Sequence, residues 1–139
     1  MSNGLLLDTH ALIWIVHDDP IARTAREAVI AAGGSGTLFI SAATAWEIGF
    51  IASKPSLLRI IGQDARAWFA RAVDATGAEI VDLTAALLLD LSVLPEPLHR
   101  DPADRMIIAT ARARDLTIVT RDRAILDYGD AGHVRALAC

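Results

Sequence analysis

The sequence predicts an α/β domain built on a mostly parallel sheet. Short apolar runs alternate with amphipathic segments of helical length, and no internal repeat, linker or shift in composition divides the chain. Strands that alternate with helices of about 10–15 residues form right-handed crossovers, which give a parallel sheet covered on both faces. The length of 139 residues suits one such domain with a single core.

Two strands and three helices are expected in the first half of the chain. Pro20 favours a helix start because proline suits the first helical position, and the pair Gly33-Gly34 favours a helix end. The segment 54–56, Lys-Pro-Ser, breaks the pattern before the second half begins. The expected elements are, in order, a strand at 5–7, a helix from Thr9 to about His17, a helix from Pro20 to about Ala32, a strand at 38–40 and a helix over 42–52.

Three short strands and three helices are expected in the second half. The first of these helices has one apolar side, formed by Trp68, Phe69, Ala72 and Val73. The expected elements are, in order, a helix over 63–75, a strand at 80–81, a helix over 84–94, a loop at 95–97, a helix over 103–114, a strand at 116–119 and a final strand near 134–137.

The composition describes a globular, mildly acidic protein. Hydrophobic residues make up 53% of the chain, which excludes a disordered or low-complexity sequence. Thirteen Lys and Arg against 17 Asp and Glu give a net charge of −4, which argues against nucleic-acid binding through bulk positive charge. Of the 17 acids 13 are Asp, which prefers helix caps, turns and ligand positions to solvated helix faces.

Several absences predict a soluble, cytoplasmic protein that does not enter the membrane. Cys139 is the single cysteine, so neither a disulfide framework nor a thiolate zinc site can form within one chain. The first residues carry no basic segment, and Asp8 interrupts the first apolar run, which argues against a signal peptide. No apolar stretch reaches the roughly 18 residues that a membrane span needs.

Two acids follow the expected strands directly. Asp8 comes after the strand at 5–7, and Asp122 comes just past the strand at 116–119. The plain interpretation makes Asp8 the N-cap of the next helix and Asp122 part of an ordinary charged surface turn. In parallel α/β sheets, however, the working site normally lies beyond the carboxyl ends of the strands.

A third acid, Glu47, lies within an expected helix. It is the only charge between Glu27 and Lys54, and its apolar neighbours predict a buried helix. An ionised carboxylate in such a helix is costly unless it is paired or bound to a metal. The plain alternative is a capping box, in which Glu47 answers the backbone amide of Thr44.

A fourth acid, Asp104, shares a helix face with Ile107 and Ile108, so it is expected to point inward at the amino end of its helix. Asp101 is expected to be the N-cap of the same helix. Carboxylates that are brought together raise one another's pKa, and a divalent Mg²⁺ or Mn²⁺ ion resolves this repulsion. Such a cluster suits metal-assisted hydrolysis of a phosphodiester.

Three blocks of the sequence resemble a known family. They are Leu6 to Trp14 (LLDTHALIW), Ser41 to Ile48 (SAATAWEI), and His99 to Ala111 with its continuation from Leu116 to Asp122 (LTIVTRD). In order and spacing these blocks are similar to the PIN-domain ribonucleases, and most similar to the VapC-type toxins of bacterial toxin–antitoxin pairs. A match in three blocks that span nearly the whole chain is specific, whereas Asp-Thr-His alone is a weak signal.

The resemblance implies one PIN domain over residues 1–139, folded as an α/β/α sandwich around a short, mostly parallel sheet. It implies an endoribonuclease that uses Mg²⁺ or Mn²⁺, cuts an RNA substrate, forms a homodimer and is silenced by a cognate antitoxin protein. Carried over by position, Asp8 and Asp104 are the principal metal ligands, and Glu47 and Asp122 close the site directly or through water.

Further residues around this site follow from the resemblance or from proximity in sequence. Thr9 and Thr120 match hydroxyl positions that support the acidic cluster in the family. Asp101 is an additional acid beside Asp104, so it stays open which acid of this pair binds the metal. Four arginines near the acids either hold RNA phosphates or neutralise the acids: Arg100, Arg105, Arg121 and Arg123.

The histidines and tryptophans are not assigned to the chemistry. His10 and His99 flank the proposed site, but no pair of histidines has the i, i+4 spacing of a metal-binding pair. The three tryptophans lie on apolar helical faces and are expected to be mostly core: Trp14, Trp46 and Trp68.

Two other functions compete with the nuclease. A haloacid-dehalogenase-like phosphatase would use Asp8 as its nucleophile, but such enzymes usually carry a second Asp where this chain has His10, and they need a lysine that Lys54 is poorly placed to supply. A catalytically inactive PIN-fold interaction module is the other alternative, and the retained acids argue against it.

Overall fold

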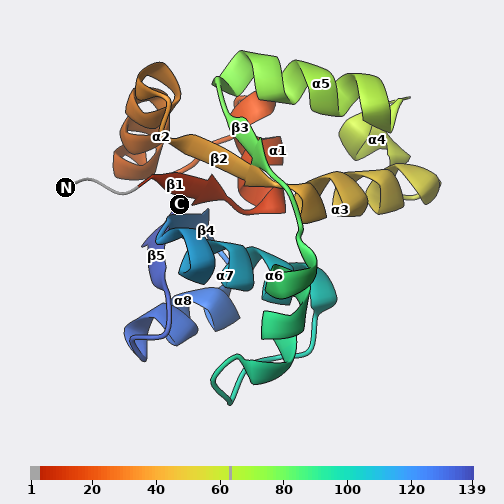
Figure 1. The fold of residues 1–139 in the computed structure, drawn as a ribbon. Helices are drawn as coiled ribbons and strands as arrows, with labels where there is room; N and C mark the ends of the chain where they lie inside the picture. Colours follow the sequence, from red (N-terminus) through yellow and green to blue (C-terminus); the bar gives the residue numbers. More distant parts are fainter. Residues whose placement is uncertain (1–3, 63) are drawn as a thin grey trace.

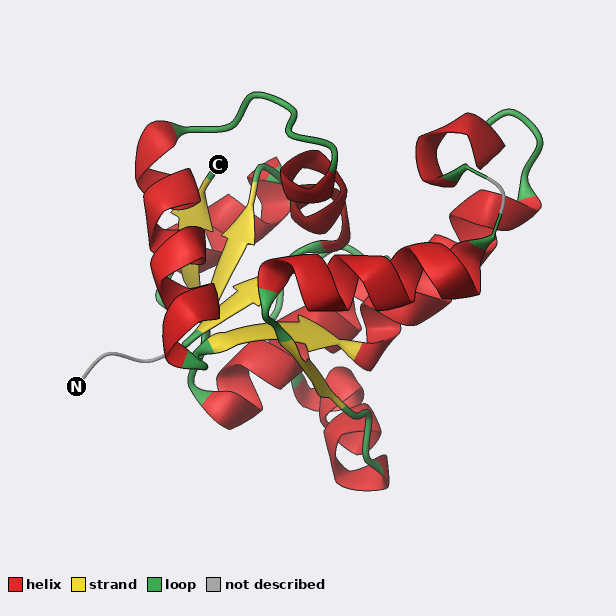
Figure 2. Ribbon diagram, turned by 90° about the horizontal axis from the view of Figure 1, so that it is seen from above, coloured by secondary structure: helices red, strands yellow, loops and turns green. Residues whose placement is uncertain are grey.

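A computed structural model describes residues 4–62 and 64–139 of the protein. Within these ranges the chain forms a five-stranded, all-parallel sheet in the order β3-β2-β1-β4-β5, with helices on both faces (Figures 1 and 2). The elements are, in order, β1 (Leu5–Leu7), α1 (Thr9–Val16), α2 (Arg23–Ser35), β2 (Leu38–Ser41), α3 (Ala42–Ser53), α4 (Leu58–Ile61), α5 (Ala65–Thr76), β3 (Glu79–Val81), α6 (Ala85–Leu89), the 3₁₀ helix η1 (Asp90–Val93), α7 (Pro102–Arg114), β4 (Thr117–Thr120), α8 (Arg123–Asp130) and β5 (Arg135–Ala138).

The central strand β1 explains the layered arrangement. Leu6 pairs with Phe39 of β2 and with Ile118 of β4, and both Leu6 and Leu7 are fully buried. Because successive side chains of a strand point to opposite faces of the sheet, these two leucines enter different cores. The sheet therefore needs a layer of helices on each face, as parallel sheets generally do.

The two cores lie on opposite faces of the sheet. One core contains Leu7 with residues of α1 to α5, among them Val29 of α2 and Trp68 of α5. The other contains Leu6 with residues of α6, α7 and α8, among them Ile108. Figure 1 shows α2 and α5 above the sheet and α6, α7 and α8 below it. The predicted α/β/α sandwich around a parallel sheet is confirmed.

The predicted start of the second helix at Pro20 is wrong, because α2 begins at Arg23. The chain before α2 is held instead by the end of the protein. The backbone amide of Ala22 donates to the carbonyl of Cys139, and the Arg121 guanidinium donates to the carbonyl of Pro20. These long-range bonds keep Pro20 outside the helix although its residue type suits a helix start.

The predicted end of the same helix at Gly33-Gly34 is also wrong. The helix continues through both glycines to Ser35 and ends at Gly36, which has a left-handed φ of 76°. Gly33 serves close packing, because a Cβ atom at this position would lie 2.3 Å from the carbonyl oxygen of Thr76. The glycine at position 33 is therefore explained by its close packing against the end of α5 and not by an end of its own helix.

Smaller differences concern the second half of the chain. The helix predicted over 84–94 divides into α6 and η1, and the short helix α4 after the break at 54–56 was not predicted. The predicted helix start at Gln63 lies outside the described residues, and α5 begins at Ala65. Among the residues that the structure describes, no helix is long and apolar enough to cross a membrane.

Candidate active site

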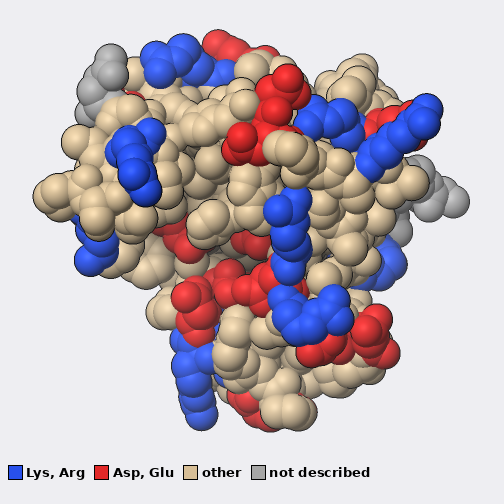
Figure 3. Space-filling model, turned by 180° about the vertical axis from the view of Figure 1, so that it is seen from behind, with Lys and Arg blue, Asp and Glu red and all other residues tan. Residues whose placement is uncertain are grey.

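Acidic residues from four segments line one hollow at the carboxyl edge of the sheet. The hollow has a volume of about 390 Å³. Figure 3 shows acidic and basic side chains gathered around a depression on one face of the molecule. The residues that line the hollow are Asp8, His10, Trp14, Glu47, Asp101, Asp104, Arg121 and Asp122.

Asp8 links the end of β1 to the start of α1 and is buried, with 7% of its surface exposed. One carboxylate oxygen accepts a hydrogen bond of 2.7 Å from the backbone amide of Thr9, so the predicted N-cap is confirmed. The other oxygen accepts a 2.7 Å bond from the Thr120 hydroxyl. Burial raises the pKa of Asp8, and these two hydrogen bonds oppose the rise. Asp8 is therefore both a cap and an acid directed into the hollow.

Glu47 lies on α3 and is half-buried. The Thr9 hydroxyl donates to its carboxylate, and the same hydroxyl lies 3.0 Å from the hydroxyl of Thr44. The capping-box alternative is wrong, because Ser41 caps α3 by accepting from the amide of Ala43, and Thr44 lies inside the helix. Burial raises the pKa of Glu47, the hydrogen bond from Thr9 opposes this rise, and the negative charge of Asp8 adds to it.

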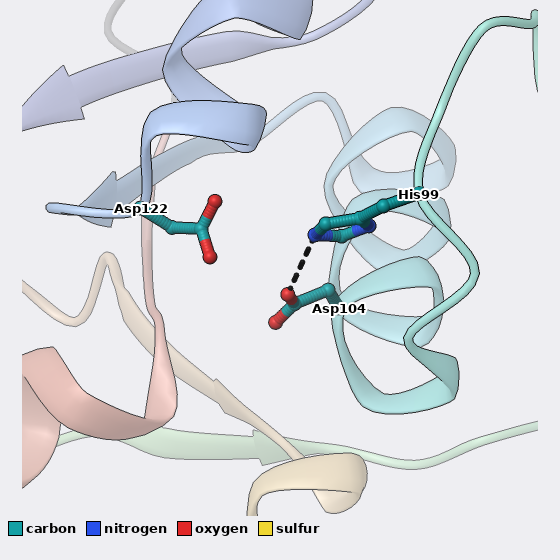
Figure 4. A group of neighbouring side chains, drawn as sticks. All are labelled: His99, Asp104 and Asp122. Carbon is teal, nitrogen blue, oxygen red and sulfur yellow. Dashed lines mark ion pairs between the residues drawn. The ribbon is translucent and has the colours of Figure 1, made fainter.

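Asp104 stands in the first turn of α7 and has 15% of its side chain exposed. Its Oδ2 atom lies 3.0 Å from Nε2 of His99, as Figure 4 shows. Burial raises the pKa of Asp104 to about 7, helped by the charges of Asp8, Asp101 and Asp122 and opposed by His99. Asp104 therefore tends to keep a proton near neutral pH when no cation is present.

Asp101 is the predicted N-cap of α7, and the structure confirms this role. Its carboxylate accepts a 3.0 Å hydrogen bond from the backbone amide of Asp104. The side chain of Asp101 also lines the hollow, but Asp101 is exposed, whereas Asp104 is half-buried. The geometry favours Asp104 as the acid of the pair that reaches into the site.

Among the described residues, His99, Asp104 and Asp122 are close enough together that they could share a cation. One ligand atom of each lies within 4.8 Å of the others (Figure 4). Asp122 N-caps α8, so it too combines a cap with a place in the hollow. From the sequence, His99 was expected only to flank the site. Its contact with Asp104 arises from a loop without periodicity and gives no sequence signal beyond proximity to the acids.

Two threonines connect the acids. The Thr120 hydroxyl donates to Asp8 and accepts from the backbone amide of Asp122, at 3.0 Å, so it joins the acids that follow β1 and β4. Thr9 joins Asp8 and Glu47 in the same way, through its amide and its hydroxyl. Hydrogen-bonded neighbours of this kind fix the orientation of carboxylates that bind metal.

The four arginines differ in their surroundings. Arg121 lines the hollow, and its Cζ atom lies 4.0 Å from the centre of the Trp14 ring. Arg123 is exposed and pairs with Asp127 on α8, and Arg100 is exposed at the rim of a neighbouring hollow. These three remain on the surface near the site.

The structure does not favour the prediction that Arg105 binds RNA phosphate. Arg105 has 8% of its surface exposed and does not line the hollow. Its guanidinium donates to the carbonyls of Leu91, Leu98 and His99 and to the carboxylate of Glu96. Each of its three nitrogens donates to the segment from Leu91 to His99, so the guanidinium holds this segment before α7.

The tryptophan prediction holds only in part. Trp68 is buried with its indole nitrogen donating to His17 at 3.2 Å, and Trp14 is half-buried at the hollow. Trp46 is 55% exposed, and Phe50 on the same helix is 56% exposed. The helix that carries Glu47 is therefore buried on one side only.

Comparison with known proteins identifies the family. Residues 5–131 match the family model of the PIN domain, and the chain belongs to this family. No curated protein sequence matches the chain. The family assignment replaces the haloacid-dehalogenase-like alternative, and Lys54 does not line the acidic hollow.

Solved structures with low sequence identity share this fold. VapBC2 from Rickettsia felis, bound to a DNA fragment from its promoter, aligns with a TM-score of 0.69 at 14% identity, over 96% of this chain and 97% of that chain. DNA-bound VapBC from Salmonella typhimurium aligns with a TM-score of 0.66 at 18% identity, over 99% and 98%. FitAcB from Neisseria gonorrhoeae aligns with a TM-score of 0.54 at 22% identity, over 96% of each chain.

The raised pKa of Asp104 predicts a pH-dependent stability of the metal-free protein. Between the ordinary value of 3.8 and about 7, the folded state holds a proton that the unfolded chain has lost, so stability falls as the pH rises through this range. We expect Asp104→Asn to be more stable than the wild type at pH 8 by about 1 kcal/mol, after solvent screening, and nearly equal to it at pH 5.

Urea denaturation in EDTA at the two pH values measures this difference. Asp74→Asn on α5 serves as the control, because Asp74 is exposed and does not line the acidic hollow. A stability difference between wild type and Asp104→Asn that is the same at both pH values would contradict the prediction.

Proposed function

We propose that this PIN-domain protein is a metal-dependent endoribonuclease that acts as a VapC-type toxin. The observation that carries the proposal is the convergence of Asp8, Glu47, Asp104 and Asp122 on one hollow, although they come from four separate segments. Three of them have a raised pKa in the absence of metal. Carboxylates in this arrangement favour a hard divalent cation, which removes their mutual repulsion.

The residues present fit Mg²⁺ or Mn²⁺. Asp8 and Asp104 are the principal ligands in this proposal, and Glu47 and Asp122 close the site directly or through water. A bound ion of this kind polarises a phosphate oxygen and lowers the pKa of a coordinated water. His99 holds Asp104 by its contact of 3.0 Å rather than serving Mg²⁺, which prefers oxygen ligands.

The rest of the hollow provides orientation and charge. Thr9 and Thr120 fix the carboxylates through their hydrogen bonds, as described above. Arg121 is held over Trp14 at the wall of the hollow, where its positive charge suits an RNA phosphate. Arg100 and Arg123 are exposed nearby and serve as further phosphate contacts in this proposal.

RNA as substrate and an antitoxin as partner rest on resemblance. The sequence blocks are similar to VapC-type toxins, and two of the similar structures are VapBC assemblies. We expect a cognate antitoxin protein to silence this chain in the cytoplasm. For the proposed homodimer, Leu89 and Val93 offer an apolar surface, since each is 74% exposed.

Cleavage of RNA by the purified, partner-free chain tests the activity. We expect cutting of total RNA with Mg²⁺ or Mn²⁺, and none in excess EDTA, because the acids need the cation to bind a phosphate. Single-stranded DNA of matched sequence is tested in parallel. Cleavage of the RNA but not of this DNA would support RNA as the substrate. Binding of RNA without cleavage under either metal would instead support an inactive interaction module.

The toxin role has a separate readout. Expression of the chain in a bacterial host is expected to arrest growth, and co-expression of a small protein encoded beside it is expected to restore growth. Harmless expression of a protein that is active in the purified assay would contradict the toxin role and leave the nuclease activity standing.

A further inference from the structure

Two large aromatic side chains on α3 are exposed and take no part in the acidic site. Trp46 and Phe50 are 55% and 56% exposed, although aromatic residues of this size are usually mostly buried. They are four positions apart, so they lie about one turn apart on the same face of the helix. Trp46 directly precedes Glu47, which lines the acidic hollow.

These aromatic side chains line a second, smaller hollow between α3 and α7. Its volume is about 220 Å³, and its other apolar wall is formed by Pro102 and Ala103. Glu47 and Asp101 line both hollows, so the two are adjacent and share a wall. The smaller one lies below the range of about 300–1,000 Å³ that suits drug-sized ligands, and it matches a single flat ring system better.

A positive charge stands beside the aromatic pair. The ammonium group of Lys54 lies 4.6 Å from the centre of the Phe50 ring. Lys54 is the single lysine of the chain, which has a net charge of −4. An aromatic surface with an adjacent cation is complementary to a nucleotide, whose base stacks and whose phosphate is negative.

We infer that Trp46 and Phe50 form a stacking site for an unpaired base of single-stranded RNA, next to the phosphate held in the acidic hollow. The inference rests on the proposed function, because it requires RNA as the substrate. The shared wall of the two hollows allows neighbouring nucleotides to occupy both. Because the bases of a duplex are already stacked on one another, this site selects unpaired RNA.

The binding of an unstructured RNA of ten nucleotides, measured by fluorescence anisotropy with Mg²⁺, tests the inference. All proteins carry Asp8→Asn, so that the RNA stays intact. We expect Trp46→Ala to raise Kd about tenfold, since loss of one base–aromatic contact costs about 1–3 kcal/mol. Trp46→Phe keeps an aromatic ring and is expected to stay within about threefold of the parent. Ile30→Ala on α2, at a side chain 68% exposed and away from both hollows, is the matched control.

Several outcomes would overturn the inference. One is a Trp46→Ala protein that binds the RNA as tightly as its parent, and another is a loss that Trp46→Phe does not restore. A Trp46→Ala protein that binds RNA normally but no longer captures the purified antitoxin would make the surface a protein-docking site. The proposed function fails separately: a chain that binds single-stranded RNA through Trp46 but cleaves none with either metal keeps the stacking site and loses the nuclease.

Discussion

Replacement of either Asp8 or Asp104 by Asn is expected to lower the rate of RNA cleavage about a thousandfold, because each change removes a charge that the cation requires. Asn keeps the size of the side chain, and at position 8 its oxygen can still accept from the amide of Thr9. The folded structure should therefore survive both substitutions. Single-turnover cleavage of a labelled RNA at saturating Mn²⁺ measures the loss, and circular dichroism checks the fold.

Asp101→Asn is the matched control for Asp104→Asn. Both residues lie at the amino end of α7 and line the acidic hollow, but Asp101 acts as the N-cap. Because Asn caps a helix about as well as Asp does, we expect Asp101→Asn to lose less than about tenfold in rate. The opposite ranking, with Asp101→Asn the more damaging change, would make Asp101 the main ligand and contradict the assignment.

The layered fold was predictable because its signal is local and repeated. Apolar runs such as Leu5 to Leu7 can be buried on both faces only in a covered sheet, and the intervening segments have helical length. Leu6 and Leu7 then enter the two cores as the period of a strand requires. Single helix ends were less predictable, since a bond from Ala22 to Cys139 holds the chain before α2, and Gly33 serves close packing at Thr76 rather than a helix end.

The acids of the site were predictable for a related reason. Asp8 and Asp122 follow strands, and the parallel sheet brings the carboxyl ends of strands to one edge. Asp104 was predicted to point inward because it shares a helix face with Ile107 and Ile108. In contrast, the role of Thr44 was misread, because Ser41 stands three residues earlier and caps the same helix. Ser41 and Thr44 are both suitable capping residues, and short-range patterns cannot decide between them. The choice depends on where β2 ends, and pairing within the sheet sets that end.

The exposure of Trp46 and the burial of Arg105 lie beyond sequence patterns altogether. Both depend on which surface the neighbouring segment covers. The apolar composition of α3 predicts burial on every side, yet Trp46 and Phe50 on one face of the helix are more than half exposed. Arg105 is buried because the irregular loop before α7 folds around its guanidinium. Such a loop has no periodicity from which its contacts can be inferred.

Replacement of Arg105 by Ala is expected to lower the free energy of unfolding by about 2–3 kcal/mol. The change leaves the carbonyls of Leu91, Leu98 and His99 without their shared donor in a part-buried setting. The pair with Glu96 adds little, because that carboxylate is exposed. Arg105→Lys keeps the charge but not the planar fork of donors, so we expect an intermediate loss.

Urea denaturation of Arg105→Ala, compared with Arg123→Ala, separates a structural role from a phosphate contact. Arg123 is 74% exposed in its side chain, so its loss should change stability by less than about 0.5 kcal/mol. If Arg105 instead bound RNA, Arg105→Ala would keep its stability and lose affinity for RNA, which would contradict the assignment. Because the carbonyl of His99 is one of the groups that Arg105 holds, the structural role also predicts weaker binding of Mn²⁺ through a displaced Asp104.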